Sequence, residues 1–262
     1  MLAKQDPKYR RLIDYLKKLG EAAVAYSGGV DSTFLLKASK DALGDKVLAM
    51  TVNSPYIPDW EINEAKEIAA QLGIQHIIVE APIADQIMNN PVDRCYLCKT
   101  FVFSKLREIA NQHGFKHVLD GTNSEDFENE RPGMKALKEL DIKSPLKVTG
   151  FTKKEIRRYS WINNLSTWDK PAYACLLTRI PYNTPVEEEN LRRIEKSEKF
   201  LIDLGIKAVR VRVHNDLARI ETEPSLIKKI FQENLMQKIS QELKSYGFKY
   251  VTMDLEGYKP SI

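Results

Sequence analysis

The sequence predicts an α/β protein: a doubly wound, mostly parallel sheet followed by a small α+β domain. Short apolar runs that suit buried strands alternate with longer helical patterns through the first two-thirds of the chain. The alternation stops after about residue 183, where two strand-like runs follow one another directly. Strands separated by helices need right-handed crossovers, which place the strands parallel. We therefore expect an α/β domain over residues 1–180 and an α+β domain over residues 186–262.

The expected strands of the first domain are short and apolar. They cover residues 21–26, 46–53, 75–79, 116–120 and 144–148. Helical patterns fill the gaps, from about Ser32 through Ala38 and over residues 59–72, 99–113 and 152–163. Gly73 and Gly114 end two of these helices, because glycine readily takes the positive φ angle found after a last helical turn.

The second domain has a different order of elements. We expect a helix over 187–204, strands over 207–213 and 217–222, a helix over 225–246 broken near Asn234, and a strand over 249–255. His214-Asn215-Asp216 joins the first two strands, and Pro181 and Pro185 bracket the linker between the domains.

Charge and hydropathy narrow the class of protein. Lys and Arg number 40 against 36 Asp and Glu, and the charges are interspersed. This mild excess permits an anionic small molecule and makes nucleic acid an unlikely partner. The first residues lack the apolar run of a signal peptide, and no stretch reaches the roughly 20 apolar residues that span a bilayer. We expect a cytoplasmic protein without a membrane partner.

Residues 27–33, with the sequence SGGVDST, lie between an expected strand and an expected helix. Two glycines allow a tight turn that aims successive main-chain N–H groups at one point, and the helix adds its positive end. This arrangement predicts a cradle for pyrophosphate. The string is neither a Gly-x4-Gly-Lys-Ser/Thr loop nor a Gly-x-Gly-x-x-Gly loop. The alternative is an ordinary glycine turn before a capped helix.

This string resembles the signature of the PP-loop ATP pyrophosphatase superfamily. The resemblance implies the fold of that superfamily and an enzyme that splits ATP between its α- and β-phosphates. It places Asp31 near a Mg²⁺ ion, as a catalytic residue, and the end of the second strand against the adenosine. The implied ATP-binding residues are Ser27, Gly28, Gly29, Asp31, Ser32, Thr33, Val52, Asn53, Gly121 and Thr122. Gly121 and Thr122 belong to the string Asp120-Gly121-Thr122-Asn123. Taken alone, this string could equally be a turn with a helix cap.

Three cysteines allow several interpretations. Cys95 and Cys98 are expected in a loop before a helix, and Cys175 lies far along the chain. An odd count argues against a closed disulfide framework, and structural zinc would need a fourth ligand. A thioredoxin-like dithiol would leave Cys175 idle. Soft thiolates favour a three-cysteine iron–sulfur cluster with one open iron. The alternatives are three buried thiols or a single reactive Cys175. Arg179 and Lys170 near Cys175 would favour its thiolate, which could attack an acyl-adenylate and give up its sulfur by β-elimination.

A basic strand–turn–strand covers residues 209–221. Strand periodicity puts Arg210, Arg212 and His214 on one face and three valines on the other. Two arginines so spaced can grip one phosphate. The alternative is a solvated face with both arginines paired to Glu221 across the hairpin.

Together, several strings resemble the LarE family of pyridinium-3,5-biscarboxylic acid mononucleotide sulfur transferases over nearly the whole chain. They are residues 27–33, called the phosphate loop from here on, and 119–123, Arg131-Pro132-Gly133, 168–171, Cys175, 178–179, 181–182 and 209–221. The resemblance implies ATP-dependent conversion of a substrate carboxylate to a thiocarboxylate, in nickel-pincer nucleotide synthesis for lactate racemase. It also implies a homo-oligomer, a hexamer. Cys95 and Cys98 resemble the cluster type, with Cys95, Cys98 and Cys175 holding a 4Fe–4S cluster. The implied substrate-phosphate residues are Thr178, Arg179, Arg210 and Arg212.

Two other enzyme classes share the loop. A tRNA 2-thiolation enzyme also combines it with cysteines, but usually has zinc-ribbon cysteines or a strongly basic surface. An ammonia-using synthetase has no use for the cysteines. A nucleotide-sensing adaptor would bind ATP without making pyrophosphate.

Overall fold

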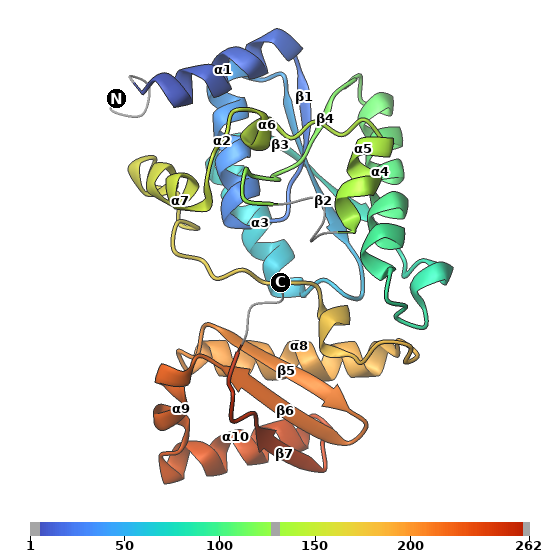
Figure 1. The fold of residues 1–262 in the computed structure, drawn as a ribbon, viewed down its shortest axis with the longest axis vertical. Coiled ribbons are helices and arrows are strands. Elements are labelled where there is room, and N and C mark those ends of the chain that lie inside the picture. The colour runs from blue at the N-terminus through green and yellow to red at the C-terminus, as the bar shows by residue number, and fades with distance from the viewer. Residues whose placement is uncertain (1–5, 127–131, 259–262) are drawn as a thin grey trace. The chain divides into compact units, whose positions relative to one another are not determined.

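The computed structural model describes residues 6–126 and 132–258 and divides the chain into two compact units (Figure 1). The first unit is Met1–Ala84 with Asp93–Tyr173, and the second is Asp85–Val92 with Ala174–Ile262. The domain boundary expected near residues 180–186 therefore falls within the second unit. Arg131, part of one family-like string, lies outside the described residues.

A four-stranded parallel sheet forms the centre of the first unit. Its strands are β1 (Ala22–Ala25), β2 (Val47–Asn53), β3 (Gln75–Glu80) and β4 (Val118–Leu119), in the order β3-β2-β1-β4. The register pairs Val24 with Ala49 on one side and with Leu119 on the other. The sheet and the helices around it confirm the predicted α/β class.

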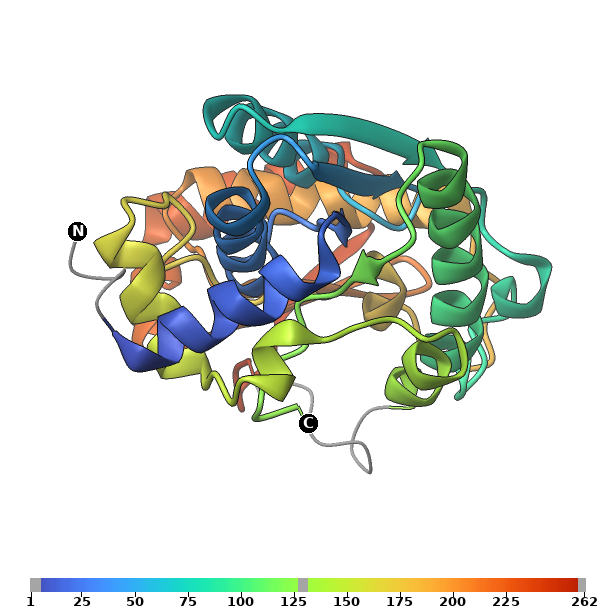
Figure 2. The ribbon, with the colours of Figure 1, turned by 90° about the horizontal axis from the view of Figure 1, so that it is seen from above.

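Helices cover both faces of this sheet, as Figure 2 shows from above. One face packs against α1 (Pro7–Leu19), α2 (Val30–Leu43), α3 (Asp59–Gln71), α6 (Pro145–Val148) and α7 (Lys153–Ile162). The other packs against α4 (Arg94–Gln112) and α5 (Gly133–Glu139). Alternate strand residues face opposite sides, so Ala22 and Val24 enter the first layer and Ala23 the second.

Two local expectations differ from the structure, and one helix was not expected at all. Residues 144–148 are not a fifth strand: Lys143 makes an isolated bridge to Leu119, and Pro145 then opens the short helix α6. Proline suits a first helical position because its missing N–H would have no partner there. Cys95 and Cys98 lie in the first turns of α4 rather than in a loop. Helix α1 was not expected, although Asp6 caps it and Pro7 begins it.

The second unit contains a three-stranded sheet in the order β5-β6-β7. Strand β5 (Val209–His214) is antiparallel to β6 (Leu217–Thr222), which is parallel to β7 (Tyr250–Met253). The accompanying helices are η2 (Asp85–Ile87), η4 (Leu176–Arg179), α8 (Glu188–Asp203), α9 (Pro224–Ile230) and α10 (Glu233–Ser245). Helix α9 ends at Ile230 and α10 begins at Glu233, which confirms the helix break expected near Asn234.

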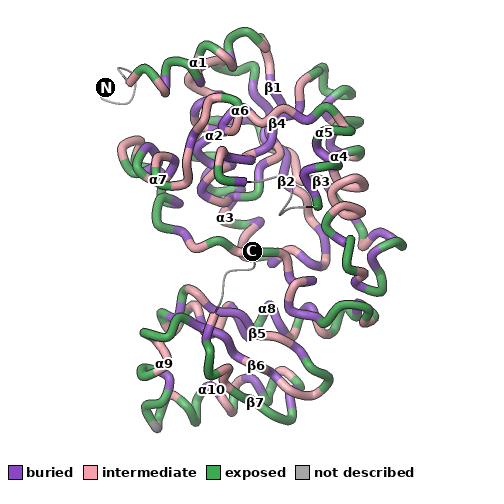
Figure 3. Tube along the Cα trace, viewed as in Figure 1, coloured by how far each residue is buried: buried purple, intermediate pink, exposed green. Residues whose placement is uncertain are grey.

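Burial is concentrated in β1, β2 and β4 of the first sheet and in β5 and β6 of the second, whereas β3 and β7 are more exposed (Figure 3). In β5 the valines at 209, 211 and 213 are all buried, as the alternating pattern predicts. Across the described ranges, no helix combines the length and apolar character needed to cross a membrane.

Candidate active site

The loop between β1 and α2 forms the first part of the site. Gly28 has a φ of +69°, and a Cβ placed there would lie 3.1 Å from the Ala65 Cβ. The positive φ favours glycine, and the short approach leaves little room for a side chain. The Ser32 hydroxyl ties the turn together: it accepts from the Ser27 N–H at 3.3 Å and donates to the Gly29 carbonyl at 3.2 Å. The start of α2 thus adjoins a fixed turn, an arrangement that suits an anion.

A pocket of about 180 Å³ opens at this loop, near the carboxyl end of β1. Ligands of open parallel sheets bind at that end of the strands. The lining residues are Ser27, Gly29, Val30, Asp31, Glu61, Lys153, Lys170, Pro171, Ala172 and Tyr173. The structure therefore brings the loop together with the region that follows α7.

Two lysines at this pocket, Lys153 and Lys170, were not among the ATP-binding residues predicted from the sequence. Lys153, the first residue of α7, forms an ion pair with Asp31. Lys170 donates to the Gly28 carbonyl at 3.1 Å and to Glu64 at 2.7 Å. Lys153 is 122 residues from Asp31, and Lys170 is 142 residues from Gly28. No local sequence pattern could therefore show that these residues meet. A usable signal was the Thr152–Glu155 capping box, which marks the helix start beside Lys153.

The acidic and hydroxyl groups of the loop differ in what they can offer a ligand. The second carboxylate oxygen of Asp31, Oδ1, is buried, and among the described residues it has no hydrogen-bond partner. Oxygen of this kind suits Mg²⁺, which prefers carboxylate ligands. Ser27 lines the pocket, whereas Thr33 is fully buried in the first turns of α2. The Thr33 side chain therefore faces the protein interior.

The 120–123 string packs against the start of α2. A Cβ on Gly121 would lie 3.0 Å from the Ser32 main-chain nitrogen, so glycine allows the close approach. Asp120 is buried and accepts hydrogen bonds from the hydroxyls of Thr122 and Ser144. Burial raises the pKa of Asp120 despite these bonds. Asp120 and Thr122 thus hold the turn, and Gly121 is its point of contact with the loop.

The end of β2 presents the two other predicted ATP-binding residues. Val52 is half-buried, and the Asn53 amide donates to both carboxylate oxygens of Glu80 at 2.9 and 3.0 Å. Nearby, the Thr51 hydroxyl bonds to the Tyr26 carbonyl at 2.6 Å. The strand end therefore has a fixed polar edge beside β1.

Cys95 and Cys98 lie three residues apart on α4, so their side chains share one face of the helix. Cys95 is exposed and Cys98 is half-buried, with its sulfur 3.3 Å from the Tyr56 hydroxyl. Burial raises the pKa of the Cys98 thiol, and the Tyr56 hydrogen bond opposes this. Within the described ranges, no group of three or more His, Cys, Asp and Glu side chains is arranged to hold a metal ion. This pair supplies two soft ligands, which fits part of a cluster site.

Cys175 immediately precedes η4 in the second unit, and Arg179 lies at the other end of that turn. The Arg179 guanidinium is buried and forms two bonds to Glu198, at 2.8 and 2.9 Å. It also donates to the Cys175 carbonyl at 3.0 Å and the Thr178 hydroxyl at 2.7 Å. These contacts hold the 174–179 segment rather than leaving Arg179 open to a phosphate.

The predicted basic face of β5 is only partly open. Arg210 is buried and donates to the Val209 carbonyl and the Tyr258 hydroxyl. Arg212, with a side chain 27% exposed, pairs with Glu221 and donates to the Thr178 carbonyl at 2.6 Å. Arg219 shares Glu221 at 2.9 Å. Arg212 therefore pairs with Glu221 across the hairpin, and Arg219 shares Glu221 from the same strand, β6.

Comparison with known proteins adds the family to this geometry. Over 96% of its length, the chain is 37% identical to the pyridinium-3,5-bisthiocarboxylic acid mononucleotide synthase of Lactiplantibacillus plantarum, covering 92% of that protein. It belongs to the LarE family. This confirms the resemblance drawn from the motifs. A second relative, the uncharacterized protein slr1717 of Synechocystis sp., is 38% identical over 97% of this chain and 96% of its own length.

Partial matches place the first unit of this LarE-family chain in a wider group. Residues 21–94 match the family model described as queuosine biosynthesis protein QueC, a stretch that includes the phosphate loop. The 7-cyano-7-deazaguanine synthase of Lysinibacillus sphaericus is 29% identical over 58% of the chain and 77% of that protein. The parallel sheet and these matches identify the PP-loop ATP pyrophosphatase fold. They also indicate an enzyme that uses ATP.

Proposed function

We propose that this enzyme uses ATP to adenylate a carboxylate of pyridinium-3,5-biscarboxylic acid mononucleotide and then converts it to a thiocarboxylate. The reaction would serve nickel-pincer nucleotide synthesis for lactate racemase. The observation that carries the proposal is the pocket where Ser27, Asp31 and Lys153 meet beside the positive end of α2. Near full-length similarity to a synthase of the corresponding bisthiocarboxylic acid mononucleotide supports the substrate.

The chemistry proceeds through an acyl-adenylate. The substrate carboxylate attacks the α-phosphorus of ATP, and the bond to the β-phosphate breaks so that pyrophosphate leaves. Main-chain amides of residues 27–33 and the Lys153 ammonium stabilise the charge that develops on the leaving group. The buried Oδ1 of Asp31 is the group that would hold Mg²⁺, which would neutralise phosphate charge. Adenosine would contact Val52, Asn53, Gly121 and Thr122.

Sulfur transfer completes the reaction. A sulfur nucleophile attacks the acyl carbon, AMP leaves, and a thiocarboxylate remains. We assign Cys95, Cys98 and Cys175 as ligands of a 4Fe–4S cluster, which would supply an open iron to carry sulfide. Sacrificial sulfur donation by Cys175 is the alternative. Thr178 and Arg212 would bind the substrate phosphate. Arg179 donates to the Thr178 hydroxyl and would hold that residue in place, whereas the buried Arg210 donates to the Val209 carbonyl and the Tyr258 hydroxyl. A homo-oligomer remains a prediction.

The products of the reaction test the proposal directly. Incubation of the purified enzyme with ATP, Mg²⁺, sulfide and the pyridinium mononucleotide, without oxygen, should yield AMP and pyrophosphate in equal amounts, quantified by chromatography. An otherwise identical incubation without the mononucleotide is the control. Formation of ADP and inorganic phosphate would contradict adenylation. AMP formation that depends on tRNA instead of the mononucleotide would favour the tRNA 2-thiolation alternative.

The cluster assignment has a test that does not require turnover. Protein purified without oxygen should be brown, and Cys95→Ala should lose the visible absorption together with bound iron and sulfide. Because Cys95 is exposed on α4, this change should leave the far-ultraviolet circular dichroism unaltered. Colourless wild-type protein that is active and loses one cysteine sulfur per turnover would instead establish the sacrificial route.

A further inference from the structure

Lys170 is almost fully buried beside the phosphate loop. Its side chain is 8% exposed, and its ammonium donates to the Gly28 carbonyl at 3.1 Å and to Glu64 at 2.7 Å. Lys153, by contrast, has a side chain 32% exposed and pairs with Asp31. The two lysines of the pocket are therefore placed differently: Lys153 pairs with a loop carboxylate and is open enough to reach a ligand, whereas Lys170 is buried against the main chain of the loop.

Aromatic rings limit the positions that the Lys170 ammonium can take. It lies 5.8 Å from the centre of the Trp60 ring and 5.9 Å from that of Tyr173. The two rings contact each other edge to face, with their centres 5.0 Å apart. Ring faces attract a cation, more strongly where water is excluded. The ammonium is thus held by a carboxylate, two rings and one main-chain carbonyl.

That carbonyl belongs to a peptide whose N–H is part of the proposed cradle. The peptide bond is planar and trans, so the Gly28 carbonyl and the Gly29 N–H point in opposite directions from the same rigid unit. The Gly29 N–H makes a long hydrogen bond to the Ser27 hydroxyl, at 3.4 Å. Fixing the direction of the carbonyl therefore fixes the direction in which the Gly29 N–H can donate.

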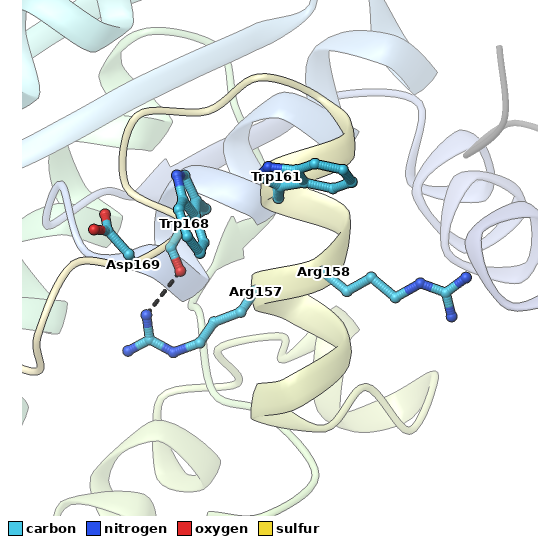
Figure 4. Close-up of a pocket in the computed structure, with 5 residues that line it drawn as sticks. All are labelled: Arg157, Arg158, Trp161, Trp168 and Asp169. Carbon is cyan, nitrogen blue, oxygen red and sulfur yellow. Dashed lines mark hydrogen bonds between the residues drawn. The ribbon is translucent and has the colours of Figure 1, made fainter.

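The segment carrying Lys170 is itself anchored to α7. Arg157 donates through its two terminal nitrogens to the Trp168 carbonyl at 2.7 Å and the Lys170 carbonyl at 2.9 Å. Figure 4 shows the first of these bonds, with Arg157 reaching from the helix to the main chain at Trp168. A continuous series of contacts thus runs from α7 through Lys170 to the phosphate loop.

We propose that Lys170 is a positioning residue that orients the Gly28–Gly29 peptide, so that its N–H faces the pyrophosphate portion of ATP. Arg157 supports it by holding the main chain on both sides of Asp169. The inference rests on the proposed function of the loop as the pyrophosphate site. It assigns Lys170 a role that acts through the main chain, with Lys153 as the lysine that contacts phosphate.

Equilibrium binding of three probes separates this role from general damage. Isothermal titration with pyrophosphate, ATP and AMP would compare wild type, Lys170→Met, Lys170→Arg and Lys154→Met. Lys170→Met should weaken pyrophosphate and ATP by about ten- to a hundred-fold, the range expected for one charge-assisted hydrogen bond, and leave AMP unchanged. Lys170→Arg should recover part of the loss. Lys154 is an exposed lysine of α7, and its variant should match wild type.

The outcomes distinguish the inference from the function on which it rests. Equal weakening of all three probes, or unchanged pyrophosphate binding in Lys170→Met, would overturn the positioning role. Wild-type protein that binds neither pyrophosphate nor ATP would overturn the proposed function itself. If Lys170→Met does not fold, Arg157→Gln carries the test, since it frees the segment but keeps the ammonium. It should show a smaller loss, confined to pyrophosphate and ATP, and an AMP loss of the same size would contradict the proposal.

Discussion

Replacing Arg179 with methionine should lower the free energy of unfolding of the second unit by about 3–5 kcal/mol. The side chains of Arg179 and Glu198 are 1% and 2% exposed, and two hydrogen bonds join them. Glu198 also accepts from the Val211 N–H at 2.9 Å, which links α8 to β5. Removing the guanidinium would leave a buried carboxylate without its counter-charge, the costliest way to break such a pair.

The positions of the tryptophans make this effect measurable within one unit. Trp60, Trp161 and Trp168 all lie in the first unit, so their fluorescence during urea unfolding reports on that unit. Hydrogen exchange of the β5 amides reports on the second. Arg179→Met should speed β5 exchange and leave the tryptophan transition in place.

Arg212→Met provides the matched control. Its partner Glu221 keeps Arg219, and the Arg212 side chain is partly exposed, so stability should fall by less than about 1 kcal/mol. Affinity for the phosphorylated substrate should fall instead. If the β5 amides of the Arg179 variant exchanged at the wild-type rate and the variant bound substrate poorly, Arg179 would instead be a substrate-phosphate residue.

Lys153→Met should reduce kcat/KM for AMP formation by about 10²–10³-fold. Lys153 pairs with Asp31 at the loop pocket, and the charge on the departing pyrophosphate would develop beside this ammonium. Stability should change by less than about 1 kcal/mol, because both side chains are partly exposed. A pyrophosphate-release assay measures the rate, and urea unfolding measures the stability.

The neighbouring exposed lysine makes the control for this variant. Lys154→Met removes the same charge from the same helix without altering the pocket lining, and it should retain wild-type kcat/KM. Wild-type kcat/KM in both variants would remove Lys153 from the reaction. Equal losses in both would indicate that the net charge of α7 matters instead of one placed ammonium.

The phosphate loop illustrates what local sequence can establish. Its two glycines, its serines and its position between a strand and a helix are all neighbours in the chain, so the turn could be predicted together with its ligand class. The alternation of strands and helices predicted the parallel sheet for the same reason. Where local signals compete, prediction was less accurate: Pro145 opens a helix in a stretch that resembles a strand. The apolar letters of residues 144–148 suited either structure.

The basic strand illustrates the opposite case. Its period-two pattern correctly placed the three valines inside. One alternative correctly paired Arg212 with Glu221, but the pattern could not reveal that Arg210 is buried or that Arg219 shares Glu221, because such contacts depend on the register of the hairpin. Arg179 was expected to bind phosphate, a proposal that its buried partner Glu198 now argues against.

The sequence by itself determined the class of fold, the phosphate loop and the family, because each of these depends on residues that are adjacent or regularly spaced in the chain. Tertiary structure alone decided which charged side chains meet. Lys153 and Lys170 reach the loop from more than a hundred residues away, and Arg179 finds Glu198 on another helix. Folding sets such contacts through the packing of whole elements, and no local pattern in the chain records them.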